Sequence, residues 1–484
     1  MDKENTRFVI VLTFVATLGG LLFGYDTAVI SGAVGAIDHY FIFPQHLSGI
    51  AASSLSGWTI SSALLGCILG AAIAGIISNR FGRKRALMVA ALMFLLGSIG
   101  SAMPELGLGV IGQMGPAALT PFIIYRIIGG MGVGIASMVS PLYIAEIAPS
   151  EIRGRLVSFN QLAIVIGILL VYFVNWFIQS LGTHAWYLST AWRLMLASES
   201  VPALLFFVLL FFVPDTPRWF VMRGRTDDAL KQLTRANGET KARTILADIQ
   251  RTLKVHNEPL LTFGIAVILI GTVLSAFQQF VGINAVLYYA PLMFKNMGAS
   301  TNSAFLQTVV VGAANLVFTF VAIATVDRIG RKPLLLIGSV VMALSMFALG
   351  GLFDTHAVGL WALVAVVAYI AGFALSWGPV VWVLLSEMFP NSIKGKAMAI
   401  AVAAQWLANL FVSWSFKVMD DSSWLNAHFN HGFAYWVYGA MGVLSALFVL
   451  RFVPETKGRT LESIQELWTR PDTGKTLSVS SETV

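Results

Sequence analysis

Twelve separate apolar stretches run along the chain, and each approaches the roughly 20 residues that a helix needs to cross the hydrocarbon core of a bilayer. Of the 484 residues, 57% are apolar and only 11% are charged, which is more apolar surface than a soluble protein can cover. The stretches are too long and continuous for the strands of a membrane barrel. We therefore predict an all-α membrane protein whose twelve transmembrane helices lie at about 8–33, 53–78, 85–104, 117–144, 155–179, 191–213, 262–294, 303–326, 333–354, 357–386, 395–417 and 431–453.

Short motifs recur once in each half of the chain, always after the corresponding stretch, at an offset of about 240 to 248 residues. The three pairs are Asn79–Arg85 with Asp327–Lys332, Glu146–Arg155 with Glu387–Lys396, and Pro214–Arg218 with Pro454–Arg459. This repeat predicts two pseudo-symmetric six-helix bundles with a site between them. The predicted division is 1–213 and 260–454 for the bundles, 214–259 for a linker and 455–484 for a C-terminal tail.

Basic residues indicate how the chain is oriented. When the loops are counted alternately, nearly all of the 31 Lys and Arg fall on one side, which includes both termini and the polar linker 214–259. By the positive-inside rule these parts are predicted to be cytoplasmic, and helical spacing of apolar residues predicts short amphipathic helices in the linker. The exceptions are Arg126, Arg193, Lys295 and Lys417. Lys295 and Lys417 fall at outer helix ends, where we expect them to snorkel toward water.

Several classes of function are disfavoured by the sequence. The seven histidines show no metal-ligand spacing, Cys67 is the single cysteine, and no phosphate-binding or dinucleotide motif occurs. The formal charge of +7 belongs to one side of a membrane, so it does not indicate a nucleic-acid partner. We predict no enzyme activity, no catalytic residues, no metal and no cofactor, and transport without a nucleotide must be secondary.

One acid stands near the middle of the first predicted span. A carboxylate there costs a few kcal/mol even on lenient insertion scales, so Asp26 is expected to be protonated or paired with Arg126 of the fourth span. Alternating neutralisation by Arg126 and by a proton is a plausible coupling switch, whereas the alternative is a permanent ion pair that fixes two helices. Glu199, in the sixth span, is a second buried acid, with a role either near a cytoplasmic latch or in proton movement.

Uncharged polar side chains inside the spans form a second candidate site. Amides offer both donors and an acceptor, which suits the hydroxyls of a neutral solute, although bonding between helices is the alternative for any single amide. The flat faces of Trp382 and Trp406 suit a sugar ring, and a tryptophan belt at the membrane interface is their alternative. We expect Gly378-Pro379 to break the helix just before Trp382, and Gly282 to loosen the seventh span between Gln279 and Asn284. We expect Asp26 and the polar group to share one water-filled chamber. The polar candidates are Gln161, Gln278, Gln279, Asn284, Tyr288, Asn315 and Gln405.

The repeated loop motifs contain acids and bases at equivalent places. Glu146 and Glu387 end the fourth and tenth spans, Arg153 follows the first of them, and Arg83 and Arg331 lie in the loops after the second and eighth spans. We expect salt bridges among these residues to latch the cytoplasmic face when the cavity opens outward. The alternative is that they only anchor the loops to anionic lipid.

The paired motifs and the PETKGR ending resemble the sugar porter family of the major facilitator superfamily, from about Ala16 to Trp468. The stretches Thr17–Ser31, Phe277–Tyr289 and Ala403–Trp414 look especially like the bacterial D-xylose:proton symporters of that family. One departure is Asp215-Thr216, where the family usually has Glu-Ser. The acid and the hydroxyl survive this difference.

The resemblance implies the major facilitator fold and a proton-coupled monosaccharide importer, with D-xylose as the expected sugar and glucose, galactose or arabinose as alternatives. It assigns proton coupling to Asp26 and Arg126, sugar contacts to the polar candidates, Trp382 and Trp406, and a packing wall to Phe23. Passive facilitators of the family tend to lack the acid, so a uniporter is the second hypothesis and a membrane sugar sensor the third. Ile168 departs from a glutamine in some close relatives, which weakens the assignment of xylose. We expect a monomer in a bacterial inner membrane.

Overall fold

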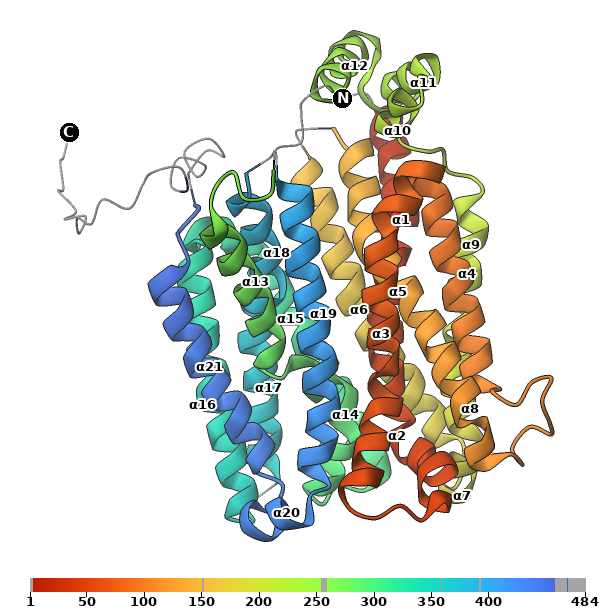
Figure 1. Cartoon of the computed structure of the whole chain (residues 1–484), viewed down its shortest axis with the longest axis vertical. Coiled ribbons are helices and arrows are strands. Elements are labelled where there is room, and N and C mark those ends of the chain that lie inside the picture. Colours follow the sequence, from red (N-terminus) through yellow and green to blue (C-terminus); the bar gives the residue numbers. More distant parts are fainter. Residues whose placement is uncertain are drawn as a thin grey trace, which may run out of the picture.

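The computed structural model describes residues 3–149, 152–253, 259–357, 359–390, 393–457 and 468. Within these residues the chain is helical and contains no strand (Figure 1). Twelve of the described helices or helix pairs are long and apolar enough to cross a membrane, which confirms the predicted number of spans. The predicted tail beyond Lys457 lies outside the described residues, apart from Trp468.

Nine of the twelve spans contain one long helix each, and the other three contain two helices in series. In chain order the spans are α1 (Lys3–Val29), α3 (Ile50–Phe81), α4 (Arg83–Ala102), α5 (Leu119–Ile147), α6 (Arg153–Ser180), α8 with α9 (Trp192–Ser198 and Ser200–Leu210), α13 with α14 (Ile265–Phe280 and Ile283–Asn296), α15 (Thr301–Ile329), α16 (Arg331–Asp354), α17 with α18 (Leu360–Leu375 and Trp377–Met388), α19 (Lys394–Asp420) and α21 (Phe433–Phe452). The short helices α2 (Val34–Ile37) and α20 (Ser423–Phe429) lie between spans, and α7 (His184–Trp186) begins the sixth span.

The helix breaks have identifiable causes. Gly282 separates α13 from α14 with a φ of 92°, a left-handed conformation that favours glycine. The sequence also predicted a break at Gly378-Pro379, but α17 ends earlier, at Ser376, whose φ is −132° and ψ −85°. Pro379 then falls in the first turn of α18, where a missing backbone N–H costs no helical hydrogen bond, so the break must precede it.

The two halves of the chain form two groups of helices that stand side by side, in warm and cool colours in Figure 1. In the first half α5 packs on α3 and α4, and α1 packs on α6; in the second half α16 packs on α21 and α13 on α19. The halves meet mainly where α3 contacts α19 and α6 contacts α15. This arrangement is the predicted pseudo-symmetric fold of twelve helices.

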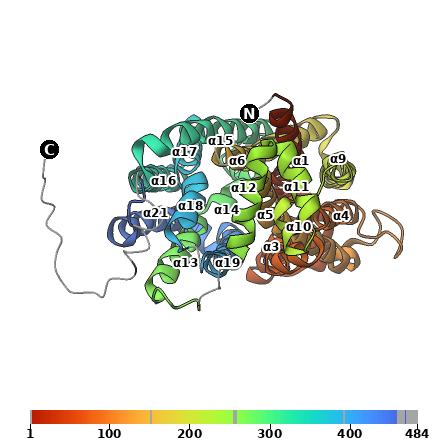
Figure 2. The same cartoon turned by 90° about the horizontal axis from the view of Figure 1, so that it is seen from above.

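Three short helices of the linker lie at one end of the molecule, over the helices of the first half, as Figure 2 shows from above. They are α10 (Pro217–Met222), α11 (Thr226–Asn237) and α12 (Glu239–Leu253). α11 buries Ala229 and Leu233 and packs on α1, where the Arg235 guanidinium lies 4.6 Å from the Phe8 ring centre. The predicted amphipathic helices are therefore present. We call this end of the molecule the linker end and the other the opposite end.

Two of the four basic residues outside the orientation pattern face aromatic rings at the opposite end. Arg193 pairs with Glu105 at 2.7 Å, and its guanidinium also lies 5.0 Å from the Tyr40 ring centre. Burial alone would raise the pKa of Glu105, but hydrogen bonds from Arg193 and Tyr40 lower it to about 2. Lys295 is half-buried, with its ammonium 5.4 Å from the Tyr187 ring centre.

Glycines allow α3 and α5 to approach each other at backbone distance. A Cβ on Gly66 would lie 2.0 Å from the Ile127 carbonyl oxygen, and one on Gly130 would lie 1.9 Å from the Ala63 carbonyl oxygen. The glycines thus alternate between the two helices, which is how membrane helices gain close van der Waals contact. This contact fixes the position of α5, the helix that carries Arg126.

We predict that Gly66→Ala lowers the thermal stability of the protein, because the new methyl group meets backbone that cannot yield, and overpacking costs about 1–3 kcal/mol. Gly75→Ala on the same helix is the matched control, since nothing lies within 4 Å of its Cβ position. Thermal unfolding of both variants in detergent measures the difference. Equal melting temperatures for the two variants would contradict the close packing.

Candidate functional site

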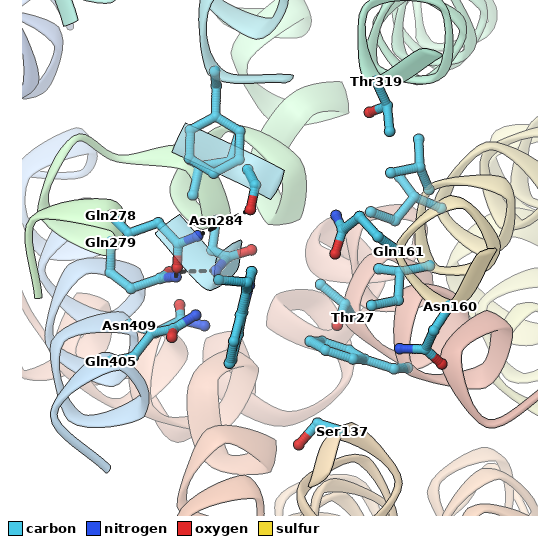
Figure 3. A pocket seen from close by; sticks show the side chains of 18 of the residues that line it. Thr27, Ser137, Asn160, Gln161, Gln278, Gln279, Asn284, Thr319, Gln405 and Asn409 are labelled. Atoms are coloured by element: carbon cyan, nitrogen blue, oxygen red, sulfur yellow. Dashed lines mark hydrogen bonds between the residues drawn. The ribbon is translucent and has the colours of Figure 1, made fainter. Parts of the chain in front are cut away.

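A cavity of about 420 Å³ lies between the two halves (Figure 3). Its walls come from α1, α5 and α6 of the first half and from α13, α14, α15, α17, α18 and α19 of the second. All ten residues predicted to bind substrate line it together: Phe23, Gln161, Gln278, Gln279, Asn284, Tyr288, Asn315, Trp382, Gln405 and Trp406. Ile168, the noted departure from relatives, lines it as well.

The broken span α13–α14 presents a connected row of amides to the cavity. Asn284 Nδ2 donates to Gln279 Oε1 at 2.6 Å, and Gln279 Nε2 donates to Gln278 Oε1 at 3.4 Å. Gln278 Nε2 in turn donates to the carbonyls of Trp377 and Gly378 at 2.8 and 3.3 Å. The two helix breaks are therefore joined by hydrogen bonds, which orient the amides before any solute enters.

Other polar groups of the cavity have unused hydrogen-bonding capacity. Gln405 Oε1, Trp406 Nε1 and Asn160 Oδ1 are buried and have no hydrogen-bond partner among the described residues. An unpartnered buried polar atom carries a free-energy cost of about 1–3 kcal/mol, which a ligand hydroxyl or water relieves. The ring centres of Trp406 and Phe23 lie 5.6 Å apart and form an apolar wall beside these groups. The cavity is thus suited to a neutral solute with several hydroxyls and an apolar face.

Six further polar residues line the cavity and were not predicted: Ser386 and the five that Figure 3 labels, Thr27, Ser137, Asn160, Thr319 and Asn409. Four of them follow a predicted residue by four positions, as Thr27 follows Phe23. Residues four apart share one face of a helix, so this spacing was the available signal. Asn160 directly precedes Gln161, and Ser137 had no comparable signal.

Asp26 and Arg126 contact each other inside the first half. Arg126 Nη1 lies 3.0 Å from Asp26 Oδ1, and the two residues are 4% and 3% exposed. They do not line the central cavity, which corrects the expectation of one shared chamber. They line a separate hollow of about 10 Å³, with Thr27 and Tyr288 forming walls of both. A hollow of that size holds about one water molecule.

Glu199, 2% exposed, lies near the Asp26–Arg126 pair, and its Oε1 has no hydrogen-bond partner among the described residues. Two buried carboxylates beside one arginine leave a net negative charge unless one of them holds a proton. Arg126 supplies one positive charge, so the three groups are neutral together when they hold one proton. This balance makes them a candidate proton site, because a net buried charge is costly.

The linker-end motif of the first half forms a closed network. Arg83, the first residue of α4, makes a bidentate pair with Glu146 at the end of α5, at 2.9 Å for both bonds. Thr216 Oγ1 donates to Glu146 at 2.6 Å, and the Arg83 backbone N–H donates to Asp215 at 2.9 Å. Burial raises the pKa of Asp215, and hydrogen bonds from backbone N–H groups oppose this effect.

The second half repeats this network, with Glu455 in the place of Asp215. Arg331 pairs with Glu387 at 3.1 and 2.7 Å, Thr456 Oγ1 donates to Glu387 at 2.6 Å, and Glu455 accepts from the Arg331 N–H at 3.1 Å. Burial would raise the pKa of Glu455, but backbone N–H donors lower it overall. In this structure Arg83, Glu146, Arg331 and Glu387 therefore form their ion pairs within their own halves.

Arg153 takes no part in either network. It is exposed, and among the described residues its guanidinium donates one long bond of 3.4 Å, to the Ala148 carbonyl. Among the predicted gate residues it is the one that the structure leaves apart from the others. Its role as a gate residue stays a prediction.

The cavity extends toward the linker end and is closed at the opposite end. Its lining includes Val157, in the first turns of α6, and Met398, in the first turns of α19. On the far side, Tyr172 Oη donates to the Leu287 carbonyl at 2.8 Å and so joins the two halves. Lys417 of the second half also joins the two halves there, through an ion pair with Asp38 of the first half. This contact corrects the expectation that Lys417 snorkels to water.

A buried polar cavity between two pseudo-symmetric helix groups, open at one end, defines a membrane transport protein with the major facilitator fold. The family model for sugar (and other) transporters matches residues 12–468, and the chain belongs to this family. It is 56% identical over 483 residues to the D-xylose-proton symporter of Escherichia coli (strain K12), which covers 98% of each chain. Membership in a family of transporters also confirms the prediction that the chain is not an enzyme.

Two further comparisons bear on the function and on the conformation of the protein. The chain is 45% identical over 473 residues to the glucose facilitated diffusion protein of Zymomonas mobilis, covering 97% of this chain and 99% of that one. A solved inward open conformation of the xylose transporter XylE from E. coli matches with a TM-score of 0.87 at 53% identity. That match covers 95% of this chain and 100% of the other.

We predict that Glu146→Gln destabilises the protein by about 3 kcal/mol, because it leaves Arg83 buried without its counter-charge. The control is Glu239→Gln, whose partner Arg243 and whose own side chain are both more than 70% exposed, so little change is expected. Thermal unfolding of the purified variants provides the comparison. The buried network is not stabilising if both substitutions leave the melting temperature unchanged.

Proposed function

We propose that this protein is a proton-coupled symporter that imports a monosaccharide, with D-xylose as the substrate. One observation carries the proposal: a cavity of uncharged polar groups with unused hydrogen-bonding capacity lies beside the buried Asp26–Arg126 pair. The name of the 56% identical relative, a D-xylose-proton symporter, supports the choice of sugar. Its coverage of 98% of both chains supports carrying the function across the whole length.

Sugar recognition follows from the chemistry of the cavity. A pyranose presents hydroxyls that both donate and accept, and the amides of Gln278, Gln279 and Asn284 supply both roles from a fixed row. Gln405 and Trp406 add an acceptor and a donor that have no protein partner among the described residues. The apolar faces of Trp406 and Phe23 then cover carbon–hydrogen surface of the ring.

Proton coupling acts through the charge on Asp26. Protonation neutralises Asp26 and weakens its attraction for Arg126, and deprotonation restores the pair. Tyr288 and Thr27, which line both hollows, transmit the rearrangement between the proton site and the sugar site. One charge moving through 100 mV yields about 2.3 kcal/mol, which is enough to concentrate a neutral solute roughly fifty-fold.

Alternating access then consists of rocking the bundles 1–213 and 260–454 around the central site, with 214–259 as linker and 455–484 as tail. The linker end faces the cytoplasm, so both termini are cytoplasmic, as the basic residues of the loops indicate. The protein works as a monomer in a bacterial inner membrane, since each chain carries a complete cavity.

The linker-end networks act as gate parts in this cycle. Arg83 with Glu146 and Arg331 with Glu387 brace the ends of the helices that must approach when the linker end closes. Arg153 is exposed in the conformation that is open at this end, and it is then free to meet the other half on closing. Glu199 belongs to the proton site and not to this gate, because it is buried near Asp26 and Arg126.

A passive uniporter is the second candidate, and the glucose facilitated diffusion protein among the relatives favours it. Uptake by proteoliposomes with and without a proton uncoupler separates the two, because a uniporter cannot accumulate sugar. Competition by D-glucose, L-arabinose and D-galactose against labelled D-xylose tests the choice of sugar. A pentose site is contradicted if D-glucose is taken up and D-xylose is not.

We expect Asp26→Asn to abolish accumulation of D-xylose while leaving binding and exchange measurable. The reason is that an amide cannot bind and release a proton as the Asp26 carboxylate does beside Arg126. Asp227→Asn on exposed α11 is the matched control and should accumulate sugar like the wild type. Counterflow and uphill uptake in proteoliposomes measure the two properties separately. Uphill uptake that persists in Asp26→Asn would remove the coupling role.

Gln405→Leu should weaken D-xylose binding about five- to ten-fold, because it removes one hydrogen bond at nearly constant side-chain volume. Gln405 Oε1 accepts no hydrogen bond from the described residues, so its removal causes little structural damage. Gln307→Leu in α15 is the control outside the cavity, since among the described residues the Gln307 amide bonds to Ser303, one helical turn away. Titration calorimetry reports both affinities, and equal values would place the sugar elsewhere.

A further inference from the structure

A buried ion pair crosses between the two halves at the opposite end. Lys417 Nζ of α19 lies 3.1 Å from Asp38 Oδ2, which follows α2, and the two side chains are only 6% and 8% exposed. Asp38 belongs to the first half and Lys417 to the second. None of the mechanism described above uses this pair.

Each member of the pair has a second partner in its own half. Ser56 Oγ of α3 donates to Asp38 Oδ1 at 2.5 Å, and Lys417 Nζ also pairs with Asp421 Oδ1 at 3.1 Å, one helical turn further on. Asp421 is partly exposed, with 34% of its side chain accessible. Lys417 therefore lies between two carboxylates, one from each half, whereas Asp38 has one cationic partner among the described residues.

The other charged groups of this region are accounted for within the second half. Asp420 accepts hydrogen bonds from Asn296 Nδ2 at 3.1 and 3.2 Å and contacts His431 Nδ1 at 3.0 Å. The hydrogen bond that the His431 ring donates to Asp420 raises the pKa of His431, burial of the ring lowers it, and the pKa is raised overall. Asp420 therefore has its own partners in the second half, and it does not replace Asp38 as the partner of Lys417.

α3 and α19 are in direct contact around the pair, so it is shielded from water. A Cβ on Gly57 would lie 2.8 Å from the Trp414 carbonyl oxygen and 3.2 Å from Lys417 Cβ. Trp414 Nε1 also donates to Ser54 Oγ of the other half at 3.1 Å. Separation of the two helices at this end must break the ion pair and this hydrogen bond together.

We propose that Asp38 and Lys417 are the outer gating pair of this transporter, and that their contact stabilises the conformation closed at the opposite end. In that conformation Asp38 is buried and needs Lys417. When the halves part, Asp38 becomes hydrated and Lys417 keeps Asp421, so the open conformation contains no unpaired buried charge. The inference rests on the alternating access of the proposed function but on neither its sugar nor its proton.

The geometry makes the two single substitutions unequal. Lys417→Met leaves Asp38 buried without a cation in the closed conformation, so that conformation loses most. Asp38→Asn leaves Lys417 paired with Asp421, so the loss is smaller. Asp421→Asn keeps the contact between the halves and serves as the matched control, since it removes a carboxylate next to the same lysine.

The experiment measures the distance between the halves by double electron–electron resonance on the full chain in nanodiscs without sugar. Spin labels occupy Ser48→Cys and Ser423→Cys, two exposed positions at the opposite end, in a Cys67→Ala background. We expect Lys417→Met to raise the ratio of long to short distances on the order of 100-fold, because an unpaired buried charge is that unfavourable. Asp38→Asn should raise it less, and Asp421→Asn should leave it near the wild-type ratio.

The double variant Asp38→Asn with Lys417→Met has neither buried charge, so its ratio of long to short distances should return toward the wild-type ratio. This variant also tests the proposed gating pair if Lys417→Met alone does not fold. Unchanged distances in folded Lys417→Met and Asp38→Asn overturn the proposal. A shift in Asp421→Asn equal to that in Lys417→Met overturns it as well. Because no sugar or proton gradient is used, failure of D-xylose symport leaves this measurement valid.

Discussion

Every polar or charged side chain inside the hydrocarbon region needs a partner or a cavity, and this requirement organises the molecule. Asp26 is paired with Arg126, the amides of α13 and α14 bond to one another, and Lys417 bridges two carboxylates. Among the buried polar groups that lack partners within the described residues, those of Asn160, Gln405 and Trp406 line the cavity. At these positions a solute can meet the unused hydrogen-bonding capacity.

The fold was largely predictable because lipid imposes a strong pattern on the sequence. Apolar length indicated the spans, and the repeated motifs indicated the two halves, since each motif forms the same network in its own half. The break at Gly282 was predictable from the residue, because its φ of 92° favours glycine. The break near Pro379 was displaced to Ser376, because proline is tolerated in the first turn of the helix it begins.

The site was predictable to the extent that polar residues within spans are costly unless they face a cavity or a partner. All ten residues expected to bind substrate line one cavity, and Thr27, Thr319 and Asn409 would have followed from four-residue spacing. Two features depend on tertiary contacts that no local pattern encodes. Tyr288 and Thr27 separate the Asp26 hollow from the cavity, and Lys417 meets Asp38, which is remote in sequence, instead of reaching water.

The polar contacts at the two ends differ in a way that matches a rocking carrier. At the linker end, Arg83 and Arg331 bind acids of their own halves, so these networks can travel with each half as rigid parts. At the opposite end, Asp38 and Lys417 and the bond from Tyr172 to Leu287 join the halves, so they must break when that end opens. Contacts within a half preserve its shape through the cycle, whereas contacts between halves set the relative free energies of its conformations. The conformation seen here, closed at the opposite end, is the one in which Asp38 keeps its cationic partner.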